Sequence, residues 1–439
     1  MLNYLRKKIS YDNPLRLIWH QFKGMAAAIR YGFPGKKMVV IGITGTNGKT
    51  TTTHMIEHIL RSAGKKVAMI STSDFSIDGK KKPNLSKKTT MSPFKTQAFL
   101  RKCLKNKVDY AVIEASSHAL HQSRLWGIPF SISVITNITH EHLDYHGTME
   151  KYAEAKKLLF KNVSKNCRRK ENETVSHIPH IKAFVLNTAD KYYDKFREVH
   201  CPVNIAYGLG QGDLQANDIT FTKHGSRFAL RYQDDIIGVD LPLVGGYNVE
   251  NALAAAGAAL TCKVSLGEIA PALNSFEGVE GRMERIKSPK GFEVVVDFAL
   301  TPDALEKLYS VLKKTTEGRL IGLIGSCGDR DKEKRPKMGE IVASYCDVTI
   351  VTDEEPYTED PKAIMEAVLA GARKIKKMGD SLKLIEDRHE AMEDAIKNAR
   401  TGDVIVVTGM GSFQTRTMNN GPIPWDDRQI ARELINKYS

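Results

Sequence analysis

The chain has 439 residues and a formal net charge of +14, and 41% of its residues are hydrophobic. This length exceeds one ordinary hydrophobic core, so we expect a globular enzyme with two or three domains. No apolar run reaches the ~18 residues of a bilayer span. The N-terminus lacks a signal-peptide core, and the scattered cysteines argue against a disulfide framework or zinc ribbon and favour the reducing cytoplasm.

The first 37 residues are basic, and residues 14–22 have the spacing of an amphipathic helix. We predict that this helix packs on the domain behind it; contact with a membrane surface is the alternative, which we do not favour. Basic clusters also lie at 80–82, 87–88 and 168–170. No base-reading motif accompanies them, so we expect no nucleic-acid partner and attribute the charge to an anionic substrate or to solvated loops.

The most informative segment is residues 45–51, which read Gly-Thr-Asn-Gly-Lys-Thr-Thr. The apolar run at 38–41 predicts a buried strand before this segment, and residues 54–60 have helical spacing after it. Ile43 stands where the standard phosphate-loop pattern has its first glycine. The strand before and the helix after nevertheless predict a nucleotide site.

The residue types in this segment suit a bound polyphosphate. Gly45 and Gly48 let the backbone come close to an anion, and the amides at the helix N-terminus then point at it. Lys49 supplies positive charge for the outer phosphates, and the Thr50 hydroxyl is suited to ligating Mg²⁺.

Strands and helices alternate from residue 38 to about 160, which is typical of a mostly parallel, doubly wound sheet. Short alternating strands are predicted between 200 and 245, and the strand–helix alternation restarts near 280. We therefore predict an α/β protein with three parts: a basic segment (1–37), a central P-loop ATP-binding domain (38–280) and a C-terminal Rossmann-like domain (281–439). Apolar runs predict strands at 67–70, 110–113, 132–135, 294–296, 320–324, 348–351 and 404–407.

Polar side chains follow two of the predicted strands. Glu114 ends the strand at 110–113, and Asn137 follows the next one. Ligands bind beyond the carboxyl ends of strands in doubly wound sheets. A carboxylate at Glu114 therefore suits a Mg²⁺ ion bridged to ATP phosphates, with a capping role as the alternative.

Residues 139–146 hold three histidines and two acids, which favours a metal-lined loop. Exposed and inert histidines at His140 and His146 are the alternative. Farther on, residues 152–160 form a helical stretch, and spacing alone predicts that its Lys156 is a surface lysine.

Taken in order, these motifs resemble the Mur ligases, and within them the branch that adds the third amino acid of the cell-wall stem peptide. The resemblance covers about residues 38–435. It is carried by the segments 44–51, 114–118, 136–137, 142–148, 155–160, 248–255, 281–285, 301–305 and 328–332.

The resemblance implies an ATP-dependent ligase that forms an amide bond. ATP would convert a muropeptide-like carboxylate into an acyl phosphate, which an amino acid then attacks. Phosphoryl transfer depends mostly on positioning and charge neutralisation, so cations should crowd the γ-phosphate. The resemblance assigns one Mg²⁺ to Thr50 and Glu114, and a second to His142 and a CO₂-derived carbamate on Lys156. This assignment reverses the reading of Lys156 as a surface side chain.

The resemblance also assigns binding residues. Catalytic roles fall to Lys49, Glu114, His142 and Lys156. The nucleotide would contact Gly45, Thr46, Asn47, Gly48, Lys49, Thr50, Thr51, Asn137, Asn251, Arg282 and Asp297, of which the last two imply closure of the C-terminal domain over the site. The acid would lie against Thr89, Thr90, Ser116, Gln122 and Arg124, and the amine against Arg330, Glu354, Glu355 and Tyr357.

The front of the chain departs from the family pattern. Only about 37 residues precede the first predicted strand, too few for the uridine-nucleotide-binding domain of this branch. We therefore expect that the acid does not carry UDP or that it is held differently.

The predicted amine pocket departs as well. Diaminopimelate enzymes carry Asp-Asn-Pro-Arg where residues 354–357 of this chain read Glu-Glu-Pro-Tyr, so Tyr357 replaces the arginine. A later glutamate of those enzymes is replaced by Phe413. Both ends of the diaminopimelate grip are absent, which argues against that amine. Lysine is still possible as the amine, and the acids that could pair with its side chain are Glu354, Glu355 and Glu359. Leu300 replaces a polar side chain near the nucleotide, so specificity or activity is expected to differ.

Two alternatives remain. Folylpolyglutamate synthetase and polyglutamate ligases share the core reaction, but the threonine pair at 89–90 and the serines of 116–117 favour the muropeptide branch. A non-catalytic, Mur-like nucleotide-binding subunit is the other, but its usual cysteine zinc insert is absent from the sequence. The joint presence of Glu114, His142 and Lys156 favours catalysis.

Overall fold

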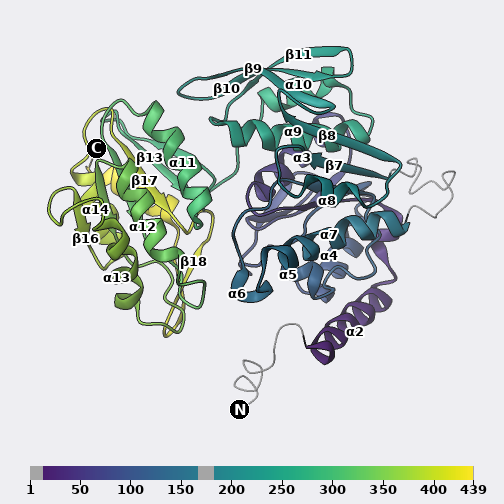
Figure 1. The fold of residues 1–439 in the computed structure, drawn as a ribbon, viewed down its shortest axis with the longest axis horizontal. Helices are drawn as coiled ribbons and strands as arrows, with labels where there is room; N and C mark the ends of the chain where they lie inside the picture. Colours follow the sequence, from purple (N-terminus) through teal and green to yellow (C-terminus); the bar gives the residue numbers. More distant parts are fainter. Residues whose placement is uncertain (1–12, 167–181, 439) are drawn as a thin grey trace. The chain divides into compact units, whose positions relative to one another are not determined.

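The computed structural model describes residues 13–166 and 182–438, so the basic cluster at 168–170 lies outside the described residues. The chain divides into two compact units, Met1–Glu277 and Gly278–Ser439. Each unit has its own sheet with helices beside it (Figure 1). The three-part division made from the sequence stays a prediction.

The described part of the first unit contains an 11-stranded sheet in the order β11-β10-β9-β8-β7-β6-β1-β5-β2-β3-β4. Its strands from β9 to β2 pair in parallel, and both ends are antiparallel, which confirms the predicted mostly parallel sheet. The strands are β1 (Val39–Thr44), β2 (Val67–Ile70), β3 (Asp74–Ile77), β4 (Lys80–Pro83), β5 (Tyr110–Glu114), β6 (Ile132–Ile135), β7 (Ala183–Asn187), β8 (Val203–Leu209), β9 (Leu214–Phe221), β10 (Ser226–Tyr232) and β11 (Asp235–Leu241).

Helices join these strands and cover the sheet, and α9 packs against α3. The predicted helices at 54–60 and 14–22 are confirmed, and both are longer than predicted. The helices are α2 (Pro14–Tyr31), the 3₁₀ turn η1 (Pro34–Lys37), α3 (Lys49–Ser62), α4 (Pro93–Lys105), α5 (Ser117–His121), α6 (Leu143–His146), α7 (Met149–Asn166), α8 (Tyr193–Arg197), α9 (Gly246–Thr261) and α10 (Leu266–Asn274). No helix in 13–166 or 182–438 is long and apolar enough to cross a bilayer.

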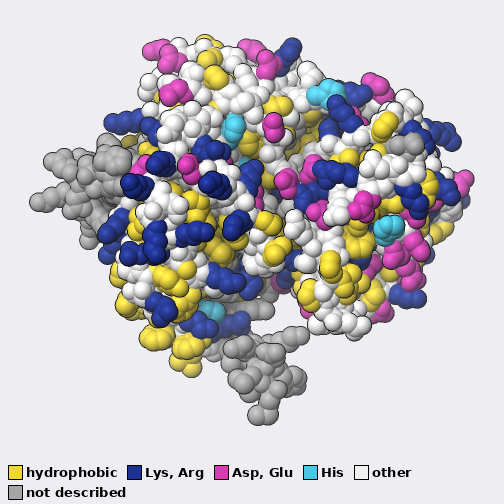
Figure 2. All heavy atoms as spheres, turned by 180° about the vertical axis from the view of Figure 1, so that it is seen from behind, with side chains coloured by type: hydrophobic (Ala, Val, Ile, Leu, Met, Phe, Trp, Pro, Cys, Tyr) yellow, Lys and Arg dark blue, Asp and Glu magenta, His cyan; other side chains and the backbone are white. Residues whose placement is uncertain are grey.

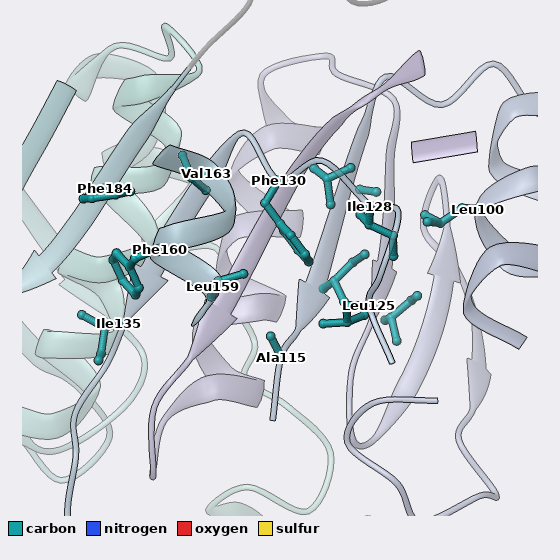
Figure 3. Close-up of a cluster of buried hydrophobic side chains, with 14 of the residues drawn as sticks. Leu100, Ala115, Leu125, Ile128, Phe130, Ile135, Leu159, Phe160, Val163 and Phe184 are labelled. Atoms are coloured by element: carbon teal, nitrogen blue, oxygen red, sulfur yellow. The ribbon is translucent and has the colours of Figure 1, made fainter. Parts of the chain in front are cut away.

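The core of the first unit fixes the position of α7. Leu159, Phe160 and Val163 on this helix are fully buried, and Figure 3 shows them in one cluster with Phe130 and Phe184. The Phe160 and Phe184 rings pack edge to face with their centroids 4.9 Å apart. Burying each such side chain contributes about 1.5–3 kcal/mol, so α7 is held firmly against the sheet.

The register of the parallel strands brings three loops to one edge of the sheet. Ile43 of β1 lies beside Glu114 of β5, and Thr44 lies beside Ile135 of β6. The carboxyl ends of β1, β5 and β6 therefore coincide. The residues that follow them, including the loop at 45–48, meet at the edge where doubly wound sheets bind ligands.

The second unit has a 6-stranded sheet in the order β12-β13-β17-β14-β15-β16 among its described residues, parallel except for β12. Alternate residues of β13 and β17 enter two hydrophobic clusters, one with α11, α12 and α13 and one with α14 and α15. This confirms the Rossmann-like fold. The elements are β12 (Glu284–Lys287), β13 (Glu293–Asp297), α11 (Pro302–Thr315), β14 (Leu320–Ile324), α12 (Lys334–Tyr345), β15 (Val348–Val351), α13 (Pro361–Ala372), β16 (Leu382–Leu384), α14 (Arg388–Lys397), β17 (Val404–Thr408), β18 (Thr415–Met418), β19 (Gly421–Pro424) and α15 (Asp427–Tyr438).

Candidate active site

The loop between β1 and α3 is fastened by the residues that follow β6. The Thr46 amide donates to the Asn137 carbonyl at 2.7 Å, and the Asn47 amide donates to Asn137 Oδ1 at 3.0 Å. Thr136 Oγ1 donates to the Asn47 carbonyl at 2.6 Å. These bonds fix the loop backbone at the N-terminus of α3, where the first amides of the helix have no partner within the helix.

Two lysine side chains meet at this loop. Lys49 Nζ donates to the carbonyls of Gly45, at 3.0 Å, and Thr46, at 2.6 Å. Lys156 Nζ donates to the same Gly45 carbonyl at 2.6 Å, and only 1% of this residue is exposed. Its interpretation as a surface lysine, which spacing alone gave, is therefore wrong. α7 turns Lys156 inward on the stripe that also carries Ala153, Leu159 and Phe160.

The surroundings of Lys156 disfavour its charged form. Burial, and then repulsion from Lys49, lower the pKa of the Lys156 amine well below its usual range. Its Nζ lies 4.3 Å from the centre of the Tyr152 ring, and the Tyr152 hydroxyl lies 3.1 Å from Thr46 Oγ1. Burial raises the pKa of the Asp190 carboxyl, whose charge in turn opposes the lowering at Lys156.

Glu114 is fully buried at the end of β5. Its Oε1 accepts the Thr72 amide at 2.9 Å, and its Oε2 accepts the Thr72 hydroxyl at 2.8 Å. Thr72 follows β2, the strand that neighbours β5 in the sheet. One residue thus orients both oxygens of the carboxylate.

The five residues predicted to hold the acid form one connected group beside Glu114. Thr90 Oγ1 donates to the Glu114 carbonyl at 2.8 Å, and Thr72 Oγ1 lies 3.1 Å from Thr89 Oγ1. Farther along, Arg124 lies within hydrogen-bond reach of Thr90 and Gln122. The contacts that join the group are the Ser116 amide to Thr90 Oγ1 (3.1 Å), Arg124 Nη1 to the Thr90 carbonyl (3.3 Å), and Arg124 Nη2 to Gln122 Oε1 (2.6 Å).

The histidine-rich segment forms a cluster of rings. The ring centroids of His118 and His142 lie 4.6 Å apart, and those of His118 and Tyr145 lie 4.0 Å apart. His146 is buried and lies 3.0 Å from Ser117 Oγ, whereas His140 is exposed. Within 13–166 and 182–438, no three His, Cys, Asp or Glu side chains are grouped as metal ligands. The predicted metal-lined loop therefore lacks a complete ligand set of those residue types in the described residues.

Asn251 of α9 packs against the phosphate loop. Thr52 Oγ1 donates to Asn251 Oδ1 at 3.4 Å, and a Cβ built on Gly48 would come within 2.1 Å of the same oxygen. Gly48 also has a φ of +82°, which favours glycine. Both constraints require glycine at position 48.

In the second unit, Arg282 lies just before β12, and Asp297 is the last residue of β13, the antiparallel neighbour of β12. The Asp297 carboxylate accepts the amides of Met283, at 2.6 Å, and Ala299, at 2.7 Å. Burial raises the pKa of Asp297, and the charge of Arg282 opposes that rise. The Arg282 guanidinium stacks 4.1 Å from the centre of the Phe298 ring.

Of the residues predicted for the amine, Arg330 follows β14, and Glu354, Glu355 and Tyr357 follow β15. The Tyr357 ring lies 5.7 Å below the Arg330 guanidinium, and Glu355 Oε1 accepts the Thr417 amide at 2.7 Å. Glu354 is buried; Cys327 Sγ lies 3.0 Å from its Oε1, and its Oε2 has no partner among the described atoms.

Glu359, the third acid considered as a partner for the amine, is already bound by other residues. Glu359 accepts from Arg335 at 2.9 Å, lies 3.1 Å from Lys332, and accepts the Asp329 amide at 2.6 Å. These contacts lower the pKa of Glu359 to about 2.

Family models match both units of this chain. Residues 43–259 match the Mur ligase middle domain, and residues 281–411 match the Mur ligase, glutamate ligase domain. A UDP-N-acetylmuramyl-tripeptide synthetase from Roseiflexus sp. (strain RS-1) is 38% identical over 416 residues, which cover 93% of this chain and 81% of that relative. The chain belongs to the Mur ligase family.

Other relatives agree with this Mur ligase assignment. A UDP-N-acetylmuramoyl-L-alanyl-D-glutamate–2,6-diaminopimelate ligase from Geobacillus kaustophilus is 36% identical over 434 residues, covering 98% of this chain and 86% of the relative. A solved structure of a ligase with the same description is 30% identical with a TM-score of 0.64, over 96% of this chain and 83% of that one. A Mycobacterium tuberculosis folylpolyglutamate synthase shares the fold, with a TM-score of 0.69 at 18% identity over 89% of this chain and 92% of that one.

Three residues at the centre of this Mur ligase site were missed from the sequence: Thr72, Tyr152 and Asp190. Thr72 and Asp190 follow β2 and β7, and their position beyond strand ends was the available signal. Among the sequence-predicted residues of the first unit, Lys49, Asn137, Lys156 and Asn251 contact the loop at 45–48, and the residues predicted for the acid lie beside Glu114. The predicted roles that join the two units stay predictions.

Proposed function

We propose that this Mur ligase couples ATP cleavage to the joining of a muropeptide-like acid and an amino acid, as a step of cell-wall peptide synthesis. The observation that carries the proposal is the convergence of Lys49 and Lys156 on the Gly45 carbonyl. Lys49 and the amides at the N-terminus of α3 offer positive charge to a polyphosphate, while burial and the charge of Lys49 keep the neighbouring Lys156 amine neutral. This donor set fits ATP.

The end of β5 fits a magnesium ion. Carboxylate and hydroxyl oxygens are the ligands that Mg²⁺ prefers, and Glu114 and Thr50 would supply one of each. Mg²⁺ supplies charge neutralisation for the phosphates. Thr72 holds the Glu114 carboxylate in a single orientation by donating to both carboxylate oxygens. Residues that hydrogen-bond to a metal ligand commonly orient it in this way.

Lys156 and His142 would serve a second Mg²⁺. A lysine ligates this ion poorly as an ammonium, but its neutral amine adds to CO₂, forming an N–C bond and releasing a proton to solvent. The product is a carbamate, an oxygen ligand with a negative charge. The lowered pKa of the Lys156 amine supports this modification because only the neutral form reacts.

The reaction would proceed in two steps. A carboxylate oxygen of the acid attacks the γ-phosphorus and ADP leaves. The nitrogen of the amino acid then attacks the acyl carbon, the bond to phosphate breaks, and the ammonium formed loses a proton to solvent. Lys49 would stabilise the charge on the transferring group, and Arg124 with Thr90 and Ser116 would hold the acid.

The amine pocket supports an amino acid other than diaminopimelate. Tyr357 offers a ring and a hydroxyl where diaminopimelate enzymes have an arginine, and it stacks with Arg330. Phe413 packs its ring 4.9 Å from that of Phe298, so this position is apolar. Glu354 Oε2 is the carboxylate oxygen of this group that stands without a partner among the described atoms.

The test is phosphate release from ATP in the presence of UDP-muramyl dipeptide or its carrier-free form and a panel of amino acids. We expect release that requires both the acid and an amine, with diaminopimelate a poor amine. Turnover with a folate-type acid and an amine, but with neither muramyl acid, would support the folylpolyglutamate alternative. Tight ATP binding with no turnover across the whole panel would refute catalysis.

A further inference from the structure

Helix α2 has two different apolar faces. The inner face is made of the small residues Gly24, Ala27 and Ala28, which are buried where α2 packs on the first unit. A Cβ built on Gly24 would come within 2.7 Å of the Ser123 carbonyl oxygen and 2.8 Å of Trp126 Cβ. The helix is thus docked closely through this face.

The outer face carries large apolar side chains that remain in solvent. At 100° per residue, these side chains fall within one arc of about 120° on the helix. Their exposed fractions are 77% for Leu15, 61% for Ile18, 53% for Trp19, 57% for Phe22, 37% for Met25 and 64% for Ile29. Monomeric proteins rarely leave a contiguous apolar surface of this kind without a partner.

Cations line one edge of this outer face. Arg16, Lys23 and Arg30 are spaced seven residues apart, so they form a row beside the apolar arc. Figure 2 shows hydrophobic side chains gathered at the lower left, over α2, with Lys and Arg side chains next to them. Burial and the charges of Arg16, Lys23 and Arg124 lower the pKa of His20, which agrees with a positive surface here.

The elements beside α2 have the same charge. Helix α4, which packs against α2, carries Lys95, Arg101, Lys102 and Lys105. Residues 13–37 and 92–107 contain no aspartate or glutamate. The surroundings of the apolar face therefore complement an anionic partner.

We propose that α2 is a membrane-docking helix, which lies in the plane of an anionic phospholipid surface with its outer face among the acyl chains. A helix of this type buries its apolar face about 5–10 Å into the boundary between headgroups and acyl chains, while its cations contact lipid phosphates. A second copy of this chain would bring cations against cations with no acids on either helix, so lipid is the better occupant. The proposal does not rest on the ligase activity.

The experiment is co-sedimentation of the full chain with vesicles. Equimolar phosphatidylcholine and phosphatidylglycerol should bind the protein at least 10-fold more tightly than phosphatidylcholine alone, and added salt should weaken the binding. The double variant Ile18→Asp/Phe22→Asp should lose at least 10-fold of this affinity. Brominated lipids should quench Trp19 in the chain with its natural residues but not in this variant.

The matched control is Phe221→Asp/Ile236→Asp, which removes two exposed apolar side chains from β9 and β11 of the same unit. It should bind vesicles like the unaltered chain, and both variants should keep its circular dichroism spectrum and thermal midpoint. Equal loss in both double variants would overturn the proposal. A mass that doubles with concentration, is unaffected by lipid and is abolished by Ile18→Asp/Phe22→Asp would overturn it in favour of an interface between copies.

Discussion

The state of the Lys156 amine determines which chemistry this residue can support. Burial and the nearby Lys49 both favour the neutral form. Because the pKa is lowered in the folded protein, the amine stays neutral at pH values where a surface lysine is protonated. It becomes charged only as the pH falls through the lowered pKa. We therefore expect CO₂ addition, and activity that depends on it, to be lost on that acid side.

Replacing Lys156 by arginine separates charge from carbamate formation. Lys156→Arg retains a cation but cannot form the carbamate, so we expect turnover to fall below detection. The protein should also lose the carbamate carbon signal in NMR with ¹³C-bicarbonate. The control is Lys157→Arg, at a lysine whose Nζ pairs with Glu198 at 2.6 Å. It should keep both the turnover and the carbamate carbon signal. Full activity in Lys156→Arg would refute the carbamate role.

The Thr72 hydroxyl should matter through Glu114. Thr72→Val removes the donor to Glu114 Oε2 and should weaken Mg²⁺ binding about 10–100-fold, as loss of a residue behind a metal ligand does. Thr53→Val is the control, since Thr53 is buried on α3 and its hydroxyl has no hydrogen-bond partner among the described atoms. Calorimetry with Mg²⁺ and ATP measures both variants. Equal affinities would exclude an orienting role for Thr72.

The sequence contains the signal that Lys156 is buried, although spacing alone predicted a surface lysine. Tyr152, Ala153, Leu159 and Phe160 recur at helical spacing around it, so the same periodicity that builds the core turns Lys156 inward. For Thr72, the sequence indicated a position beyond a strand end but not its contact with Glu114. The contact of β2 with β5 depends on strand order, which the sequence does not reveal.

At the scale of the elements, the phosphate loop depends on Gly48. Gly48→Ala should abolish ATP binding, because the methyl group would overlap Asn251 Oδ1 in addition to the strain at φ +82°. Gly64→Ala is the matched control: its φ is +72° but no atom lies within 4 Å of the new Cβ. It should cost about 1–2 kcal/mol of stability and leave ATP binding intact. ATP affinity and thermal unfolding of the two variants test this difference.

The strands were predicted better than the helices. β2, β6, β14 and β15 coincide with their predicted apolar runs, because strands buried on both faces are continuously apolar. Helix α3 begins five residues earlier than its predicted helical stretch at 54–60. Its first turn consists of Lys49 and four threonines, which are poor apolar signals, and it starts at Gly48 without a side-chain cap.

At the scale of the whole molecule, each unit has its own core and should respond separately to damage. Arg388 and Asp427 form a fully buried ion pair in the second unit, with Nη2 and Oδ2 2.7 Å apart. Arg388→Met leaves Asp427 buried without its cation and should destabilise this unit by about 3–5 kcal/mol. Arg227→Met, which breaks an exposed pair with Asp240 in the first unit, should cost about 0–1 kcal/mol.

Urea unfolding followed by hydrogen exchange assigns these losses to a unit. We expect Arg388→Met to raise exchange in β14 and β17 but not in β1 and β5. A loss of equal size in both units would contradict independent cores.

The most direct test of the proposed chemistry follows an oxygen atom. An acid that supports turnover is labelled with ¹⁸O in its carboxylate and incubated with ATP and the amine, and the released phosphate is analysed by mass spectrometry. An acyl phosphate requires that one labelled oxygen pass from the acid to phosphate in each turnover. Phosphate that carries no label would contradict the mechanism.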